Sequence, residues 1–274
     1  MLSGRLSIVA AAILWSTGGV AIKLSTLNAS QIAAGRAAFA AVALFVFLPQ
    51  ARRRWSRGVL LTAIPLALTS ILFISANQLT TAGAAIFIQN VAPIWILVAT
   101  PWLLGERASR GELLSVWVSV FGCALFFADD LGAAQTTGNA LAALASLTYA
   151  ALIVRYRKVS SEDGVTATVC GNTLIALLCL PFVARGEVPT DIADLGVVMY
   201  LGLIQQALAA ILFIRGVRTV SALEASLLLL LEPLLSPVWA FVLAGERMGS
   251  LAIAGGVVVF VAMLLRTFAA RPRR

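Results

Sequence analysis

Long apolar runs separated by short polar segments dominate the chain, and each run is about as long as a helix that crosses a bilayer. A crossing helix needs about 20 mostly apolar residues, more than a core helix of a soluble protein usually has in succession. Ten runs meet this length, and an even number of crossings brings both ends of the chain to the same side of the membrane. The expected spans are residues 6–24, 30–48, 58–77, 81–103, 111–128, 137–156, 164–183, 193–214, 220–243 and 249–268.

The composition supports a membrane protein and excludes several other classes. The 274 residues are 61% hydrophobic and 12% charged, with a mean hydropathy of +0.98, whereas soluble proteins carry about 25% charged residues. Ten spans with short connections leave no room for a sizeable domain outside the membrane. The sequence therefore predicts an all-α protein of ten transmembrane helices. It argues against a soluble enzyme, a secreted disulfide scaffold and a receptor with a separate sensor domain.

The basic residues behind the net charge of +8 fall mainly on one side of the membrane. Clustered basic residues attract nucleic acids, but most of these residues fall in connections that share one side of the membrane. These connections are segments 52–57, 107–110, 155–158, 215–218 and 266–274. Such a bias follows the positive-inside rule, and it predicts cytoplasmic N- and C-termini in a bacterial-type inner (plasma) membrane. We therefore expect a lipid bilayer, and no nucleic acid, as the partner of these charges.

Residues that usually carry catalysis or bind metals are scarce. The chain has no histidine, and its three cysteines, Cys123, Cys170 and Cys179, lie inside expected spans without a C-x-x-C spacing. The sequence has no H-E-x-x-H motif, no G-x-S-x-G motif and no paired carboxylates at mid-depth. We therefore expect no enzyme, no catalytic residues, no metal and no cofactor. A channel is less favoured than a carrier, because the mid-depth polar residues are concentrated rather than strung along a pore.

An internal repeat divides the chain into two halves. Residues 81–107 align without gaps on residues 221–247, at an offset of 140, with 8 of 27 positions identical, including a mid-span proline and a Gly-Glu-Arg triplet. The repeat unit is five spans, and because five is odd the second copy must enter the membrane from the opposite face. The expected halves are residues 1–133 and 134–274. Inverted repeats of this kind are typical of secondary transporters, because two near-equal halves can exchange conformations around a midplane site.

These features resemble a known family. The residues that carry the likeness are Trp15, Gly35-Arg36, Pro93 followed by Gly105-Glu106, and Glu232-Pro233 followed by Gly245-Glu246. In their order and spacing the chain resembles drug/metabolite transporters of the EamA type, a family of ten-span proteins made of two five-span repeats. The likeness covers the whole chain. On overall similarity, the chain looks most like the branch of aromatic amino-acid exporters of the YddG type.

Polar residues at mid-depth are the candidates for a substrate cavity, because a polar group in hydrocarbon is costly unless it faces a cavity or a partner helix. The candidate residues are Trp15, Ser16, Asn77, Gln78, Gln89, Asn90, Pro93, Trp95, Tyr149, Gln205, Glu232, Pro233 and Ser236, of which Asn77 and Gln78 lie nearer the outer end of their span. Gln89, Asn90 and Pro93 share one helix face, and Pro93 frees a backbone carbonyl near residue 89. The two amides either line the cavity or tie neighbouring helices together.

Two charged residues within the spans bear on the substrate. Glu232 is the only acidic residue at mid-depth, and its charge must be neutralised by a proton, a cation or a basic partner. Glu232 and Arg36 serve either in charge coupling and substrate binding or in pinning one helix to another. A carrier of polyanions needs several cations at mid-depth, and this chain has one at most. The expected substrate is therefore apolar, zwitterionic or cationic.

The sequence thus predicts a secondary transporter that works by alternating access around a central cavity. We expect it to export amphipathic small molecules, foremost aromatic or other apolar amino acids. Export of cationic drugs or other metabolites is the alternative, and an intramembrane enzyme or a channel is less favoured. The sequence carries no signal for the coupling ion, the direction of transport or the oligomeric state.

Overall fold

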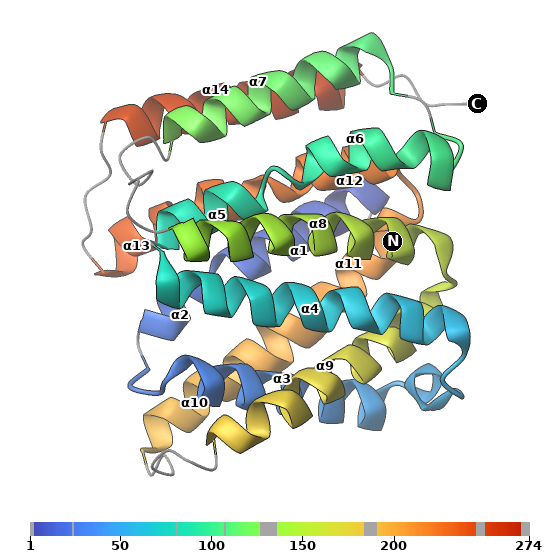
Figure 1. Cartoon of the computed structure of the whole chain (residues 1–274), viewed down its shortest axis with the longest axis vertical. Helices are drawn as coiled ribbons and strands as arrows, with labels where there is room; N and C mark the ends of the chain where they lie inside the picture. Colours follow the sequence, from blue (N-terminus) through green and yellow to red (C-terminus); the bar gives the residue numbers. More distant parts are fainter. Residues whose placement is uncertain are drawn as a thin grey trace.

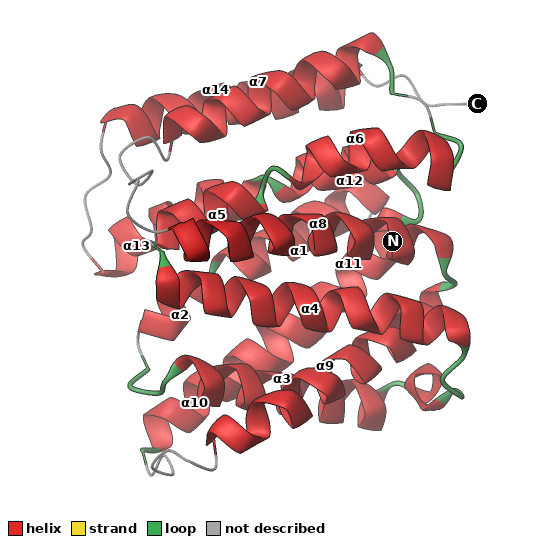
Figure 2. Ribbon diagram, in the orientation of Figure 1, coloured by secondary structure: helices red, strands yellow, loops and turns green. Residues whose placement is uncertain are grey.

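The computed structural model describes residues 3–23, 25–80, 82–106, 108–126, 136–183, 191–244 and 250–269, and within these ranges the protein is helical, without strands (Figure 2). The helices are α1 Gly4–Ser16, α2 Gly18–Lys23, α3 Ala29–Phe47, α4 Arg57–Leu79, α5 Ala82–Gln89, α6 Ala92–Leu103, α7 Arg110–Phe126, α8 Thr136–Lys158, α9 Ser161–Val183, α10 Ile192–Tyr200, α11 Ala209–Val217, α12 Ala222–Leu229, α13 Leu231–Ala244 and α14 Ser250–Ala269. A 3₁₀ turn covers Pro49–Arg52, and a π-helical segment, Leu201–Leu208, joins α10 to α11.

Polar residues begin several helices where the apolar runs start. Asn28 forms a capping box with Gln31, because each side chain accepts a hydrogen bond from the backbone N–H of the other. Ser56 caps α4 and Ser221 caps α12 in the simpler way, through the side-chain oxygen alone. These caps satisfy backbone donors that would otherwise lack partners at the helix N-terminus.

Seven helical stretches in the described part of the chain are long and apolar enough to cross a membrane. They are Gly4–Ile22, Ser30–Phe47, Arg57–Ala76, Thr136–Lys158, Ser161–Val183, Ile192–Val217 and Ala222–Leu243. The other expected ranges, 81–103, 111–128 and 249–268, hold the short helices α5 and α6, the 17-residue helix α7 and the 20-residue helix α14. The protein is therefore a helical membrane protein with several spans.

The helices lie side by side along a common direction (Figure 1). Helices α7 and α14 pair along one edge of the bundle, and α3 packs against α9 along the opposite edge, while α1 contacts α11 and α13 between them. Ala11 and Ala12 of α1 and Ala40 of α3 are fully buried in this packing. Small residues let membrane helices approach closely, which favours van der Waals packing where the hydrophobic effect gives little.

The stretch from α10 to α11 is fixed against α3 at two points. Asp194 accepts hydrogen bonds from the Ser25 hydroxyl (2.6 Å), the Thr26 hydroxyl (2.6 Å) and the Thr26 N–H (2.9 Å) in the connection before α3. Further along, a Cβ at Gly202 would lie 2.5 Å from the Cβ of Phe39, so only glycine permits this approach. The π-helical segment is thereby held directly against α3.

Three of the expected continuous spans are interrupted. The first breaks at Thr17, between α1 and α2; the fourth at residues 90–91, between α5 and α6; and the ninth at Leu230, between α12 and α13. Pro93 and Pro233 lie in the first turns of α6 and α13 and lack the N–H that would continue the preceding helix. The breaks at residues 90 and 230 are 140 residues apart, the offset at which the two segments align.

The two ends of the bundle differ in charge. The end formed by the connections at 48–56, 159–160 and 218–221 carries Arg53, Arg157 and Arg218, and we call it the basic end. Helix α1 begins and α14 ends on the same side as these connections (Figure 1). Asp194 and its partners lie at the opposite end.

Candidate functional site

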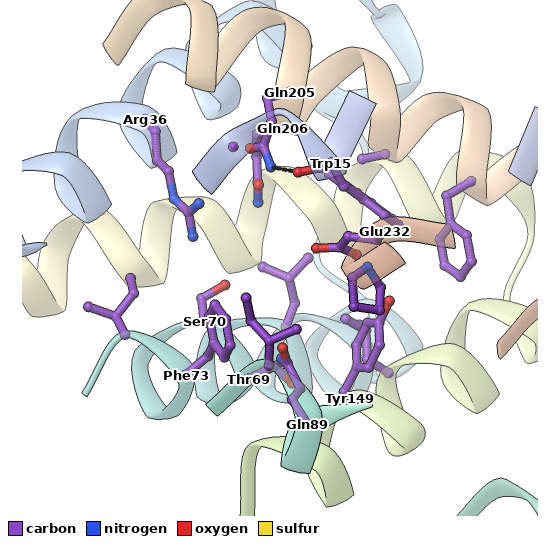
Figure 3. Close-up of a pocket in the computed structure, with 18 of the residues that line it drawn as sticks. Trp15, Arg36, Thr69, Ser70, Phe73, Gln89, Tyr149, Gln205, Gln206 and Glu232 are labelled. Atoms are coloured by element: carbon purple, nitrogen blue, oxygen red, sulfur yellow. Dashed lines mark hydrogen bonds between the residues drawn. The ribbon is translucent and has the colours of Figure 1, made fainter. Parts of the chain in front are cut away.

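A cavity of about 510 Å³ lies inside the bundle. Its wall is built by α1, α2, α3, α4, α5, α8, α9, the π-helical segment, α11 and α13. No described residue of α7 or α14 contributes to it. Much of the wall is apolar, from residues such as Ile22, Leu66 and Ile86, and a smaller number of polar side chains lie among them (Figure 3). A cavity of this size fits a small molecule that is largely apolar.

The break between α1 and α2 is held by side chains from two other helices. The Trp15 carbonyl accepts a hydrogen bond from Nε2 of Gln205 (3.2 Å), and the Ser16 carbonyl accepts one from the Ser236 hydroxyl (3.0 Å). The Ser16 hydroxyl also accepts from Nε1 of Trp239 (2.8 Å). Carbonyls released at a helix break within a membrane need such partners. The break therefore ties the first span to α13 and the π-helical segment at the cavity wall.

The π-helical segment presents two successive amides to the cavity. Gln206 donates through Nε2 to Oδ1 of Asn172 (3.2 Å) on α9, whereas Gln205 donates to Trp15. The Oε1 of Gln205 is buried and has no hydrogen-bond partner among the described residues. Gly18 faces this amide, and a Cβ there would lie 2.8 Å from Nε2 of Gln205. π-helical turns within α-helices often occur at functional sites.

One charge of each sign flanks the cavity. Arg36 extends into it from α3, and Glu232 extends from α13 on the other side, with Gln205 and Gln206 between them (Figure 3). The described residues contain no ion pair between the two, whose charged atoms are therefore more than 4.0 Å apart. The cavity thus has a positive side and a negative side.

Aromatic rings close the cavity toward the basic end. The ring of Phe213 lies 5.4 Å from that of Trp15 and 5.7 Å, edge-on, from that of Tyr156. The Tyr156 hydroxyl shares a 2.6 Å hydrogen bond with the Thr168 hydroxyl, and Phe213 and Tyr156 are almost fully buried. We call Trp15, Phe213 and Tyr156 the aromatic floor. It offers ring faces and edges to an apolar group above it.

Below the aromatic floor, polar contacts join residues 1–133 to residues 134–274 at the basic end. Glu106, after α6, forms an ion pair with Arg157 (3.3 Å) and accepts a hydrogen bond from the N–H of Ala222 at the start of α12 (3.2 Å). Arg5 of α1 pairs with Glu224 of α12 at 2.7 Å. These contacts link helices of the two parts of the chain at the basic end.

A model of the EamA-like transporter family matches residues 2–128 and again residues 136–268. The chain belongs to the EamA-like transporter family. Members of this family are transporters, which argues against the enzyme alternative. The described residues also hold no cluster of three or more His, Cys, Asp or Glu side chains placed to bind a metal ion.

Individual EamA-like relatives are distant. The chain is 26% identical over 265 residues, 96% of its length and 95% of the relative's, to an uncharacterized transporter of Archaeoglobus fulgidus. Over 192 residues, 67% of its length, it is 25% identical to a protein of Streptantibioticus cattleyicolor named a probable terminal-alkyne amino-acid exporter, and the match spans 63% of that protein. A solved crystal structure superposes with a TM-score of 0.83 over 98% of this chain and 97% of its own chain, at 18% identity, which bears on the fold alone.

Many of the candidate residues of this EamA-like chain meet at one place. The structure brings these residues to the cavity wall: Trp15, Arg36, Gln89, Asn90, Tyr149, Gln205, Glu232, Pro233 and Ser236. Asn90 donates its amide to the Ile86 carbonyl of its own helix (2.9 Å), so it stabilises the end of α5 rather than tying two helices. Gln89 makes no hydrogen bond with another described residue and remains available to a solute.

Other candidate residues lie away from the wall. Ser16 is fully buried at the break after α1, and Pro93 is buried in the first turn of α6. Trp95, on the next turn, is 40% exposed and donates to the Ser146 hydroxyl of α8 (3.1 Å). The break at residues 90–91 ends the helix face that carries Gln89, so α6 follows a separate course. The side chains of Asn77 and Gln78 lie outside the described part of the structure.

The cavity wall also includes residues that sequence reasoning missed. They are Thr69, Ser70 and Phe73 of α4, Tyr156 of α8 and Thr168 of α9. Thr69 and Thr168 donate to carbonyls of their own helices, at Pro65 and Gly164, which removes most of the cost of a hydroxyl in hydrocarbon. The only available signal was the polar pair Thr69-Ser70 in the middle of the expected span 58–77.

Proposed function

We propose that this EamA-like protein is a secondary transporter that exports amphipathic small molecules, foremost aromatic or other apolar amino acids, across a bacterial-type inner membrane. The observation that carries the proposal is the cavity, which has a largely apolar wall, an aromatic floor and one charge of each sign. A polyanion would need several cations, and only Arg36 supplies a positive charge among the lining residues.

The proposed mechanism is alternating access of two inverted five-span repeats, residues 1–133 and 134–274. Three observations support it: the family model matches each half, the two segments align at an offset of 140, and their helices break at residues 90 and 230. Two structurally equivalent halves can adopt two packings of similar energy, and the exchange between them carries the solute.

The proposed orientation places both termini and the basic end in the cytoplasm, as the distribution of arginines favours. The contacts of Glu106 with Arg157 and of Arg5 with Glu224 then close the cytoplasmic side. The name of the Streptantibioticus cattleyicolor relative supports amino acids as the substrate class. We further propose that the chain belongs to the YddG-type branch of aromatic amino-acid exporters, which it resembles in overall sequence.

Transport by the purified protein in liposomes tests this proposal. Liposomes loaded with unlabelled phenylalanine should accumulate labelled phenylalanine by counterflow, with saturable kinetics and above the level of protein-free liposomes. A phosphorylated sugar should not compete, because the described lining residues include one cation, Arg36. The panel also contains leucine and a cationic drug, with and without a pH gradient. Saturable exchange of the drug but of no amino acid would establish the alternative substrate class, and a current independent of substrate would indicate a channel.

A further inference from the structure

Two charged groups at the cavity lack a hydrogen-bond or ion-pair partner among the described residues. Arg36 and Glu232 act on each other only electrostatically, across the cavity, and Oε1 of the lining residue Gln205 is buried and unbonded. A buried polar group without a partner is costly, and a buried charge without one more so. A binding site can keep such groups because its ligand supplies the missing partners. The donors and acceptors that lack partners therefore indicate which groups the ligand carries.

The chemistry of these groups fits a ligand that carries both a negative and a positive charge. A guanidinium donates to a carboxylate through two parallel N–H groups, and a carboxylate accepts from an ammonium. Arg36 and Glu232 lie on opposite sides of the cavity, on α3 and α13 (Figure 3). A solute with one charge would pair with one side and leave the other charge without an ion-pair partner.

We propose that the cavity recognises the zwitterionic head group of an α-amino acid, with the carboxylate on Arg36 and the ammonium on Glu232. Gln205 lies between the two charged residues in Figure 3, and its unbonded Oε1 accepts a second hydrogen bond from the ammonium once the ligand is bound. The apolar side chain of the amino acid lies against the aromatic floor. This inference rests on the proposed function and assigns its specificity to three residues.

Ligands that differ from phenylalanine by one head-group charge test the inference in the wild-type protein. Phenylalaninamide lacks the carboxylate, and 3-phenylpropionate lacks the ammonium, while both keep the benzyl group. Each analogue should inhibit the counterflow of labelled phenylalanine at least about tenfold more weakly than phenylalanine, because it leaves one buried charge unpaired. Equal inhibition by all three, with phenylalanine exchange intact, would overturn the inference and leave the proposed function standing.

Two variants assign each charge to its residue. Arg36→Gln should lose the preference for phenylalanine over phenylalaninamide and keep the preference over 3-phenylpropionate. Glu232→Gln should show the reverse pattern. Arg36→Lys should retain the carboxylate preference in part, because the charge remains. Arg52→Gln, which removes a charge outside the cavity wall, is the matched control and should leave both preferences unchanged.

The crossed pattern separates recognition from a structural role. If Arg36 and Glu232 only pin helices, each variant should weaken all ligands by the same factor or lower the melting temperature without changing the ratios, and that result would overturn the inference. If a variant does not fold, the inhibition series on the wild-type protein decides alone. Absence of exchange for every amino acid would instead count against the proposed function.

Discussion

At the scale of single residues, a glycine determines how the first span meets the π-helical segment. Gly18 follows the break at Thr17 and leaves room for the amide of Gln205, which reaches the Trp15 carbonyl at 3.2 Å. The missing side chain thus allows a buried carbonyl to find its donor. The same contact orients the unbonded Oε1 of Gln205 at the cavity wall.

Gly18→Ala should weaken substrate binding without unfolding the protein. The new Cβ would lie 2.8 Å from Nε2 of Gln205, so the flexible amide must move and lose its bond to Trp15. We expect the KM for phenylalanine counterflow to rise several-fold. Gly196→Ala is the matched control, because a Cβ there meets no atom within 4 Å. Equal KM values for the two variants would contradict this role for Gly18.

Residues such as Glu232, Gln205 and Gln89 could be predicted from the sequence, because a strongly polar side chain within the bilayer is costly unless it faces a cavity or a polar partner. Thr69 and Thr168 could not be predicted, because each hydroxyl donates a hydrogen bond to a carbonyl of its own helix, which lowers the free-energy cost of placing it in the membrane. For Arg36, the sequence left substrate binding and helix pinning open. Its direction into the cavity follows from the packing of α3, which no local pattern specifies.

At the scale of helices, interruptions build the site. The breaks at Thr17, at residues 90–91 and at Leu230 all lie next to residues of the cavity wall, and the π-helical segment supplies two amides. Backbone groups exposed at such breaks are tolerated in a membrane where they meet a cavity or a polar partner. Continuous helices would carry the same side chains in other directions.

Pro93→Ala should slow transport while keeping the fold. Alanine restores the N–H that can bond to the Gln89 carbonyl, so α5 and α6 can join as one helix and Gln89 turns relative to the cavity. We expect a several-fold lower counterflow rate with an unchanged or higher melting temperature. Pro101→Ala, near the end of α6 and exposed, should keep the wild-type rate. A wild-type rate for the first variant would show that the break is not needed.

The helices themselves follow from apolar length, and the break at residues 90–91 follows from Pro93. The break at Thr17 has no proline near it. It depends on Gln205 and Ser236, which are distant in sequence and bond the carbonyls of Trp15 and Ser16. The π-helical segment is likewise set by the close approach of Gly202 to α3. Contacts between residues that are far apart in the sequence depend on how the helices pack, and the local sequence shows no pattern for them.

At the scale of the whole molecule, the two ends of the cavity are unlike. The aromatic floor and the contacts of Glu106 and Arg5 lie toward the basic end. In the proposed cycle these contacts must break for a solute to enter from the cytoplasm. They therefore set the balance between the two conformations, and weakening them should shift that balance.

Glu106→Gln should open the basic end more often. The change weakens the ion pair with Arg157 and the bond from Ala222. A reporter Thr168→Cys, in a protein whose native cysteines are replaced, lies in the cavity wall just above the closure. We expect a cytoplasmic, membrane-impermeant thiol reagent to label it several-fold faster in this variant. Arg52→Gln is the control, because Arg52 bonds only carbonyls of its own segment, at Phe45 and Val46. No change in labelling rate would exclude these contacts as the gate.

The pairing of α7 with α14 has a practical consequence. The two helices meet closely, since a Cβ at Gly122 would lie 2.7 Å from a methyl of Val259 and 3.1 Å from the Gly255 carbonyl. Their described residues stay clear of the cavity, and Trp117 and Phe121 face outward. A fluorophore or an antibody fragment attached at the ends of these two helices, outside the bilayer, could report on the protein, or enlarge it for electron microscopy, without obstructing the passage of the transported solute.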